Sequence, residues 1–189
     1  MKYTWLVRRA ASPAVAVLML LAIGCQQPQV REALDLKGLT RLDSARGVQD
    51  SKTDLLWYDA TLLAVEGRGW SETEDFYDRL PAKSKSVVRP EVWGLSKNSA
   101  GLCVRFVTDS DRIAARWTTT SKNMAMDHMP ATGVSGLDLY AKDGGQWQWV
   151  AVGRARSAPT NESVLAREIP AGVHEYMLYL PLYNGTESL

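Results

Sequence analysis

The chain has 189 residues, of which 46% are hydrophobic and 23% are charged, with 8 Pro and 14 Gly. These values exclude a disordered polymer, a collagen and a large multidomain protein. The formal net charge is only +1, from 22 basic against 21 acidic residues, so no charge excess points to nucleic acid as a partner. With only two histidines, His128 and His174, we expect no metal site and no cofactor.

Residues 1–24 are predicted to be an export signal. Three basic residues stand near its start, and an apolar run follows from Ala14 to Ile23. Ten residues are too few for a permanent membrane-spanning helix, which needs about 20. The run ends in Leu-Ala-Ile-Gly-Cys, which resembles the lipobox of bacterial lipoproteins. The resemblance implies that Cys25 receives a diacylglycerol and becomes the first residue of the mature chain.

Cys25 is therefore interpreted as a membrane tether and not as a catalytic residue. Each buried methylene of an acyl chain contributes about 0.8 kcal/mol, so two or three chains anchor a soluble domain stably. We expect an exported lipoprotein of the bacterial cell envelope that touches the membrane only through this anchor. Gln26 and Gln27 follow the cysteine, and the lack of Asp there resembles outer-membrane sorting in Gram-negative bacteria. Cys103 is the only other cysteine, and we interpret it as a small core or strand residue.

The mature chain is predicted to hold one domain on a tether. Cleavage before Cys25 removes three basic and no acidic residues, which changes the net charge from +1 to −2. Residues 25–53 are polar without a sustained period, which indicates a flexible tether. Residues 54–189 alternate short apolar runs with Gly, Pro, Asn and Asp clusters, a pattern typical of all-β proteins. We expect a jelly-roll-like sandwich of two antiparallel β-sheets.

Two pairs of apolar runs predict β-hairpins. Residues 102–107 and 113–117 both alternate, and the Asp-Ser-Asp at 109–111 suits a tight turn between them. Residues 137–142 and 146–152 are joined by Asp143-Gly144-Gly145, which tolerates positive φ. Further strands are expected at residues 56–59, 61–65, 87–93, 163–169 and 173–180. Helical signal is limited to one short turn at residues 71–77, which resembles a capping box.

No catalytic constellation is recognisable in the sequence. The segment Gly133-Val134-Ser135-Gly136-Leu137 misses the last glycine of the α/β-hydrolase pattern Gly-x-Ser-x-Gly. None of the three Asp-Ser pairs follows a glycine, and neither histidine has Asp three positions before it. The sequence therefore lacks the blocks that an SGNH-type hydrolase requires.

Four residues are weak candidates for binding. Trp147 and Trp149 share one face of a predicted strand, where flat rings could stack on sugars, although we favour packing in the core. Arg105 and Arg116 alternate with core positions on two predicted neighbouring strands, so both could grip a carboxylate from one outer face. A solvated or ion-paired sheet face explains the two arginines equally well.

A longer set of motifs resembles a known domain family. Gly136-Leu137-Asp138-Leu139-Tyr140 resembles the Gly-x-Asp-Leu-Tyr domain at the N-terminus of SGNH-hydrolase-type esterases. The resemblance covers residues 55–189 and includes the motifs at residues 57–60, 67–70, 77–81, 92–96, 99–106, 129–133 and 179–185. It implies a jelly-roll-like β-domain that precedes an SGNH catalytic domain, in enzymes that resemble carbohydrate esterases.

The resemblance implies an accessory role, because the catalytic serine, Asp and His of such proteins lie in the second domain. We expect a non-catalytic module of a lipid-anchored carbohydrate esterase that positions an acylated glycan or braces the SGNH domain. The alternative is a free-standing glycan-binding lipoprotein. Asp138 is expected to hold a turn or pair with an arginine, and Tyr140 to reach a ligand or partner domain. The interpretation that we favour is that the motif, with Gly136 and Leu139, locks a strand into the sandwich.

Overall fold

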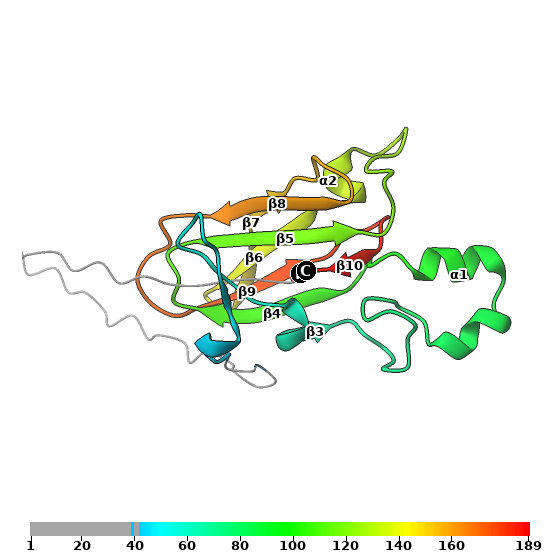
Figure 1. Ribbon diagram of the computed structural model, residues 1–189, viewed down its shortest axis with the longest axis horizontal. Coiled ribbons are helices and arrows are strands. Elements are labelled where there is room, and N and C mark those ends of the chain that lie inside the picture. The colour runs from blue at the N-terminus through cyan, green and yellow to red at the C-terminus, as the bar shows by residue number, and fades with distance from the viewer. Residues whose placement is uncertain (1–38, 40–41) are drawn as a thin grey trace, which may run out of the picture.

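The computed structural model describes residue 39 and residues 42–189 (Figure 1). The export signal, Cys25 and most of the expected tether lie outside these described residues. Within them, ten strands form three antiparallel sheets, and the two larger sheets pack face to face. The predicted all-β sandwich is therefore confirmed. No helix in the described part has the length and apolar character needed to cross a membrane.

The larger sheet of the sandwich has the strand order β3-β4-β9-β6-β7. Its strands span Ala64–Glu66, Cys103–Thr108, His174–Tyr179, Leu137–Asp143 and Gln146–Gly153. The smaller sheet has the order β10-β5-β8, with strands Thr186–Ser188, Ile113–Thr119 and Thr160–Ala166. The third sheet is the pair β1 (Val48–Gln49) and β2 (Leu56–Trp57). Short helices link these strands: η1 (Ser44–Arg46), η2 (Ala60–Leu62), η3 (Ala82–Ser86), α1 (Pro90–Ser96) and α2 (Ala131–Val134).

The core fills the space between the two large sheets. Successive side chains of a strand point to opposite faces, so alternate residues face the space between the sheets. Val104 and Phe106 of β4 face inward, and Ile113 and Trp117 of β5 meet them from the other sheet. The side chain of Trp117 is fully buried, and its indole N–H donates to the Ser135 carbonyl at 2.9 Å. A buried indole without such an acceptor would destabilise the core.

The outer face of the smaller sheet is covered by the β1-β2 pair. Leu55 and Trp57 form a buried cluster with Ala114 of β5. The guanidinium of Arg116, also on β5, lies 4.4 Å from the centre of the Trp57 ring. Part of the region expected as a tether, residues 44–49, therefore forms η1 and β1 beside the sandwich. One outer face is thus occupied by the chain itself.

The predicted hairpin at residues 137–152 is confirmed as β6 and β7. Asp143 pairs with Gln146, so Gly144 and Gly145 form a two-residue turn. Their φ angles of 52° and 78° match the turn that favours the right-handed twist of hairpins. The register shifts between Leu139 and Tyr140, which indicates a bulge in the pair.

The predicted hairpin of residues 102–107 with 113–117 is wrong. β4 pairs with β3 and β9 in the larger sheet, whereas β5 pairs with β8 and β10 in the smaller one. The link between β4 and β5 crosses from one sheet to the other, and Ser110 in this link is buried and donates to the Arg112 carbonyl at 2.7 Å. Turn-forming residues suit a link between two sheets as well as a hairpin. The apolar faces of β4 and β5 bury more surface when the strands lie in opposite sheets and pack face to face than when they pair side by side.

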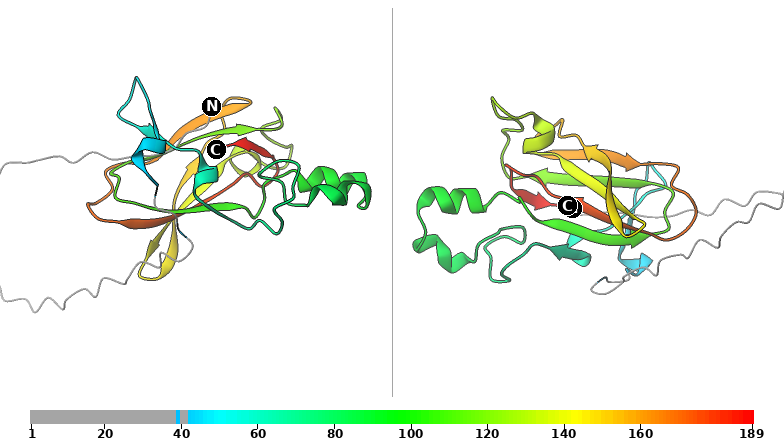
Figure 2. Two further views of the ribbon diagram at one scale, coloured as in Figure 1. Left: turned by 60° about the horizontal axis from the view of Figure 1, so that its bottom comes forward. Right: turned by 180° about the vertical axis from the view of Figure 1, so that it is seen from behind.

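Residues 67–98 form an arm that extends past the end of the sheets in all three ribbon views (Figures 1 and 2). The strand predicted at residues 87–93 is wrong, because this stretch enters α1. Pro90 occupies the first turn of the helix, where its fixed φ and missing N–H are favourable. The β-branched Val87 is 82% exposed and not part of any strand. Residues 71–77 contain bends and a turn but no helix.

The remaining predicted strands are shorter or shifted in the structure. Residues 56–59 yield only β2, and residues 61–65 yield η2 followed by β3. β8 begins and ends three residues before the predicted 163–169. The predicted strand at residues 173–180 is β9, but it is not the last one, because β10 follows and pairs with β5. The carbonyl of Leu189 accepts from the Ala60 N–H at 2.9 Å, so the described chain ends against the sandwich edge.

Candidate functional site

The outer face of the larger sheet carries most of the sequence-predicted site residues. Paired residues of antiparallel strands share a face, so the register orders their side chains in rows. One row contains Arg105, Met177, Tyr140 and Trp149, taken from β4, β9, β6 and β7 in turn. On β6 and β7 the next pair is Lys142 with Trp147. The structure therefore brings Arg105, Tyr140, Trp147 and Trp149 onto one face.

Trp149 lies at the surface and not in the core. Its side chain is 57% exposed, so the favoured core-packing interpretation is wrong for this residue. Its indole N–H donates to a carboxylate oxygen of Asp138 at 3.1 Å. Asp138 therefore pairs with a tryptophan in place of the expected arginine, while lying, as expected, on the opposite face from the buried Leu137 and Leu139.

Three further aromatic rings surround Trp149 on this face. Tyr140 pairs directly with it, and Tyr140 and Tyr179 contact each other edge to face with ring centres 5.7 Å apart. Trp147 lies below the Lys142 ammonium, which is 6.0 Å from its ring centre. Both tyrosines and Trp147 are half-buried. We call Tyr140, Trp147, Trp149 and Tyr179 the aromatic patch.

A chain of alternating charges borders the aromatic patch. Glu175 is fully buried, and the Arg105 guanidinium binds one of its carboxylate oxygens. The Lys142 ammonium lies 3.1 Å from the other oxygen. Burial would lower the pKa of Arg105, but the hydrogen bond and charge of Glu175 outweigh it and raise that pKa. Since both ends of Glu175 are paired, the charges are held in place beside the patch.

Arg116 lies on the opposite side of the molecule from Arg105. It belongs to β5 of the smaller sheet, so the expectation that both arginines share one outer face is wrong. The cause is the same crossover that separates β4 from β5. Arg116 contacts Glu162 at 2.7 Å and stacks on Trp57, and thus forms part of an ion-paired face.

Cys103 is buried on β4 beside Tyr179, with which it pairs across to β9. Burial, with a smaller effect of the Glu66 charge, raises the pKa of its thiol from 9.0 to about 11. A thiol with this pKa carries almost no thiolate at neutral pH, which makes it a poor nucleophile. The interpretation of Cys103 as a small buried residue agrees with its burial.

Gly136 of the family motif lies where two backbone segments meet. A Cβ atom at this position would lie 2.3 Å from the Thr132 carbonyl oxygen and 2.8 Å from that of Gly153. The glycine therefore allows α2 to pack directly against the start of β6 and the end of β7. Leu139 is fully buried two residues into the same strand.

Ser135, which directly precedes the Gly-x-Asp-Leu-Tyr motif, is a buried structural residue. Ser135 has no exposed surface, and its hydroxyl accepts from the Asn184 amide at 3.0 Å. Among the hydrogen bonds between described residues, none joins a serine to a histidine: the His174 ring contacts the Pro170 carbonyl. Among the same residues, no group of three His, Cys, Asp or Glu side chains could hold a metal ion.

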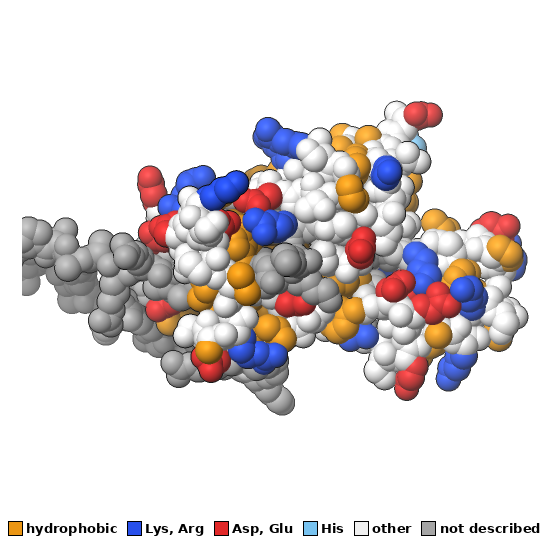
Figure 3. Space-filling model, viewed as in Figure 1, with side chains coloured by type: hydrophobic (Ala, Val, Ile, Leu, Met, Phe, Trp, Pro, Cys, Tyr) orange, Lys and Arg blue, Asp and Glu red, His pale blue; other side chains and the backbone are white. Residues whose placement is uncertain are grey.

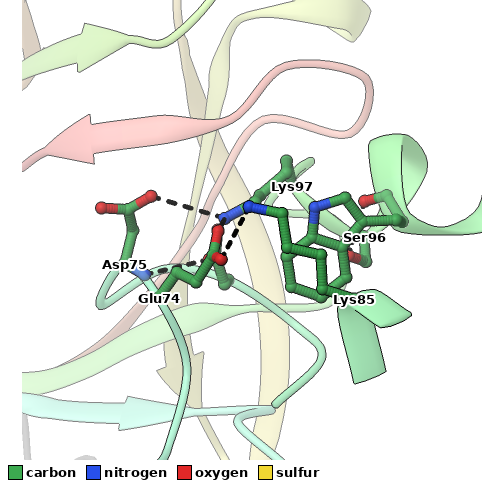
Figure 4. A network of polar contacts seen from close by, with 7 residues as sticks. Glu74, Asp75, Lys85, Ser96 and Lys97 are labelled. Atoms are coloured by element: carbon green, nitrogen blue, oxygen red, sulfur yellow. Dashed lines mark hydrogen bonds and ion pairs between the residues drawn. The ribbon is translucent and has the colours of Figure 1, made fainter. Parts of the chain in front are cut away.

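The arm has a polar centre that the sequence did not reveal. The Lys97 ammonium contacts Glu74 at 2.9 Å, Asp75 at 3.5 Å and the buried Asp78 at 2.6 Å (Figure 4). The same ammonium lies 4.9 Å from the centre of the Trp93 ring, and Lys85 adds a second contact to Glu74 at 2.9 Å. Acidic and basic side chains accordingly gather on the arm in Figure 3, with apolar ones between them.

The arm also exposes large apolar side chains. They are Trp70, Phe76, Val87 and Leu95, and each has at least a third of its surface accessible. The arm is also held by backbone hydrogen bonds, such as Arg79 N–H to the Ser96 carbonyl at 3.1 Å, and by the contacts of Lys97. An exposed apolar set on a protruding element is typical of a protein interface.

Sequence reasoning missed Glu175, Lys97 and Asn184. Each depends on partners from distant segments, such as Arg105 for Glu175, so no local pattern marks it.

Comparisons with known proteins find a matching family model and a similar solved structure. A family model described as GxDLY, the N-terminus of the SGNH-hydrolase esterase type, matches residues 55–189. Among solved structures, a protein described as a GDSL-like lipase from Bacteroides ovatus is similar, with 32% sequence identity and a TM-score of 0.63. The similarity covers 69% of this chain but only 38% of that protein, so this chain spans well under half of its length. No curated protein matches the chain.

Proposed function

The chain belongs to the GxDLY family, the N-terminal domain of SGNH-hydrolase-type esterases, and we propose that it is the non-catalytic accessory module of a lipid-anchored carbohydrate esterase. The observation that carries the proposal is the family match over the whole sandwich, at residues 55–189. The fully buried Ser135, whose hydroxyl is hydrogen-bonded to Asn184, supports a role without chemistry in this domain. The ester bond is broken by the SGNH domain, with this module bound beside it.

The arm is the part of the molecule that suits contact with an SGNH domain. It projects from the sandwich, and Val87 and Leu95 expose 82% and 57% of their surface. Its ion pairs around Lys97 hold it in one conformation before binding, so little conformational entropy is lost on docking. An arm of this kind braces a neighbouring domain through apolar contacts.

The first test of the accessory role is the coding sequence beyond the Leu189 codon. We expect an open frame that leads to a Gly-Asp-Ser block and a late Asp-x-x-His, the motifs of an SGNH catalytic domain. A stop codon directly after Leu189 would overturn the accessory role in cis and favour the free-standing glycan-binding lipoprotein. The exposed Trp149 is the observation that keeps this second function open.

The docking role of the arm is tested in the two-domain protein that such a frame encodes. Leu95→Lys places a charge in the apolar contact, and we expect one cooperative thermal unfolding transition to split into two. Val48→Lys is the matched control, because Val48 is also exposed but lies on β1, at the other end of the sandwich. Identical melting curves for Leu95→Lys and the parent protein would contradict docking through the arm.

The lipid anchor is tested by metabolic labelling of expressing bacteria with an alkyne-bearing fatty acid. The parent chain should carry the label and sediment with membranes, and Cys25→Ala should lose both properties. Cys103→Ala is the control, because it removes the only other thiol and leaves the lipobox unchanged. Equal labelling of the Cys25→Ala variant would show that this residue is not the site of acylation.

A further inference from the structure

The aromatic patch presents a flat ring on a rigid support. Trp149 exposes 57% of its side chain, while its indole N–H is held by Asp138 at 3.1 Å. β7 is paired with β6, which is paired in turn with β9, so the backbone beneath the ring is fixed. A held ring that keeps its face open can stack on a ligand with little loss of rotational freedom.

Hydrogen-bonding groups surround this ring on the same face. Tyr140 pairs with Trp149 across the strands, and its hydroxyl belongs to a half-buried side chain. Asp138 and Lys142 lie on either side of Tyr140 along β6. Apolar ring faces bordered by hydroxyl, carboxylate and ammonium groups match the pyranose unit, which has apolar C–H faces and a rim of hydroxyl groups.

The surroundings of the patch favour a sugar over a protein partner. Two cations and two carboxylates border the patch, because Arg105 contacts both Glu175 and Glu66 while Lys142 contacts Glu175. These four charges balance one another, so an uncharged ligand does not have to compensate them. Four of the large exposed apolar side chains lie together in sequence on the arm, at residues 70, 76, 87 and 95, and these suit a protein partner better than the patch does.

We propose that the aromatic patch is a carbohydrate-binding site that stacks a pyranose ring on Trp149 and hydrogen-bonds its hydroxyl groups through Tyr140. This inference rests on the proposed function, because it identifies the glycan backbone as the group that the module positions for the esterase. The contacts recognise the sugar ring and not the acyl group. Acylated and deacylated forms of one glycan therefore bind with similar affinity.

The test is affinity electrophoresis of the full-length chain in non-ionic detergent, through gels that contain acetylated xylan, the same xylan after mild alkaline deacetylation, or dextran. We expect both xylans to retard the parent chain equally. Trp149→Ala should weaken the retardation about tenfold or more, whereas Trp149→Phe retains part of it. Tyr140→Phe should weaken it less than Trp149→Ala, because the ring remains.

Trp70→Ala is the matched control, since Trp70 is a similarly exposed tryptophan on the arm. It should leave the retardation unchanged, and near-ultraviolet circular dichroism verifies that each variant is folded. Retardation that is equal for Trp149→Ala and the parent chain, or absent in all three polysaccharides, overturns the proposal. Absence of xylan binding by the parent chain, together with an intact two-domain melting transition, would reject the sugar site while leaving the accessory function standing. Trp149→Ala splitting that transition would show instead that the SGNH domain covers the patch.

Discussion

Gly136 contributes to the fold because it has no side chain, which lets two backbone segments pack closely. The carbonyl oxygens of Thr132 and Gly153 approach the position that a Cβ atom would occupy to 2.3 Å and 2.8 Å. Both are backbone atoms, so neither can move without shifting α2 or β7. The first residue of the Gly-x-Asp-Leu-Tyr motif is thus explained by packing, and Leu139 of the same motif by burial in the core. Asp138 and Tyr140, the two remaining named residues of the motif, lie on the outer face of the sheet.

Gly136→Ala should lower the free energy of unfolding by about 3 kcal/mol, at the upper end of overpacking effects, because the new methyl group collides with fixed backbone. Chemical denaturation followed by tryptophan fluorescence measures this change. Gly94→Ala is the control: no atom lies within 4 Å of its added Cβ, and it is in α1. Alanine there should leave stability unchanged or raise it by about 1 kcal/mol. A Gly136→Ala variant as stable as Gly94→Ala would contradict the packing argument.

At the level of elements, local patterns identify strands better than they identify strand partners. The β6-β7 hairpin follows from a two-residue turn with two glycines, because such a turn imposes the pairing. The link from β4 to β5 has residues equally suited to a turn, yet it joins strands of different sheets. The arm is a different case, since α1 has only seven residues and is held by contacts with distant parts of the arm.

The arm should loosen when its central cation is removed. Lys97→Met keeps the length of the side chain but leaves the carboxylates of Glu74 and Asp78 without their shared partner. Hydrogen exchange measured by mass spectrometry should become about tenfold faster in residues 71–98, with β4 and β9 unchanged. Lys83→Met tests the loss of an exposed lysine from η3 in the same arm and should leave exchange as it is. Unchanged exchange in Lys97→Met would show that the ion pairs do not hold the arm.

At the scale of the whole molecule, buried polar residues fasten the last strand to the sandwich. The Asn184 side chain accepts from the Ser121 N–H at 3.0 Å and donates to the Ser121 carbonyl at 3.1 Å. Nearby, the Ser99 hydroxyl donates to Thr186 and accepts from its backbone N–H at 2.9 Å. These bonds join segments that are 63 and 87 residues apart in the sequence. They place β10 beside β5, where it completes the smaller sheet.

Asn184→Ala should reduce the free energy of unfolding by about 3 kcal/mol, because it removes two hydrogen bonds to Ser121 and the amide that donates to the fully buried Ser135 hydroxyl. Urea denaturation gives this value directly. Asn123→Ala, in the loop that contains Ser121, removes an exposed amide and should change stability by less than about 0.5 kcal/mol. If the two variants have equal midpoints, Asn184 does not fasten the last strand.

The sequence by itself determined the all-β class, the β6-β7 hairpin and the family to which residues 55–189 belong. These follow from the alternation of apolar residues, from turn chemistry and from motifs, all of which are local in the chain. The tertiary structure alone decided that β4 and β5 lie in different sheets, that Arg105 and Arg116 therefore point to opposite sides, and that Trp149 is open to solvent. The physical reason is that both faces of a strand in a sandwich can carry large side chains. Which face becomes core is set only when the two sheets pack together.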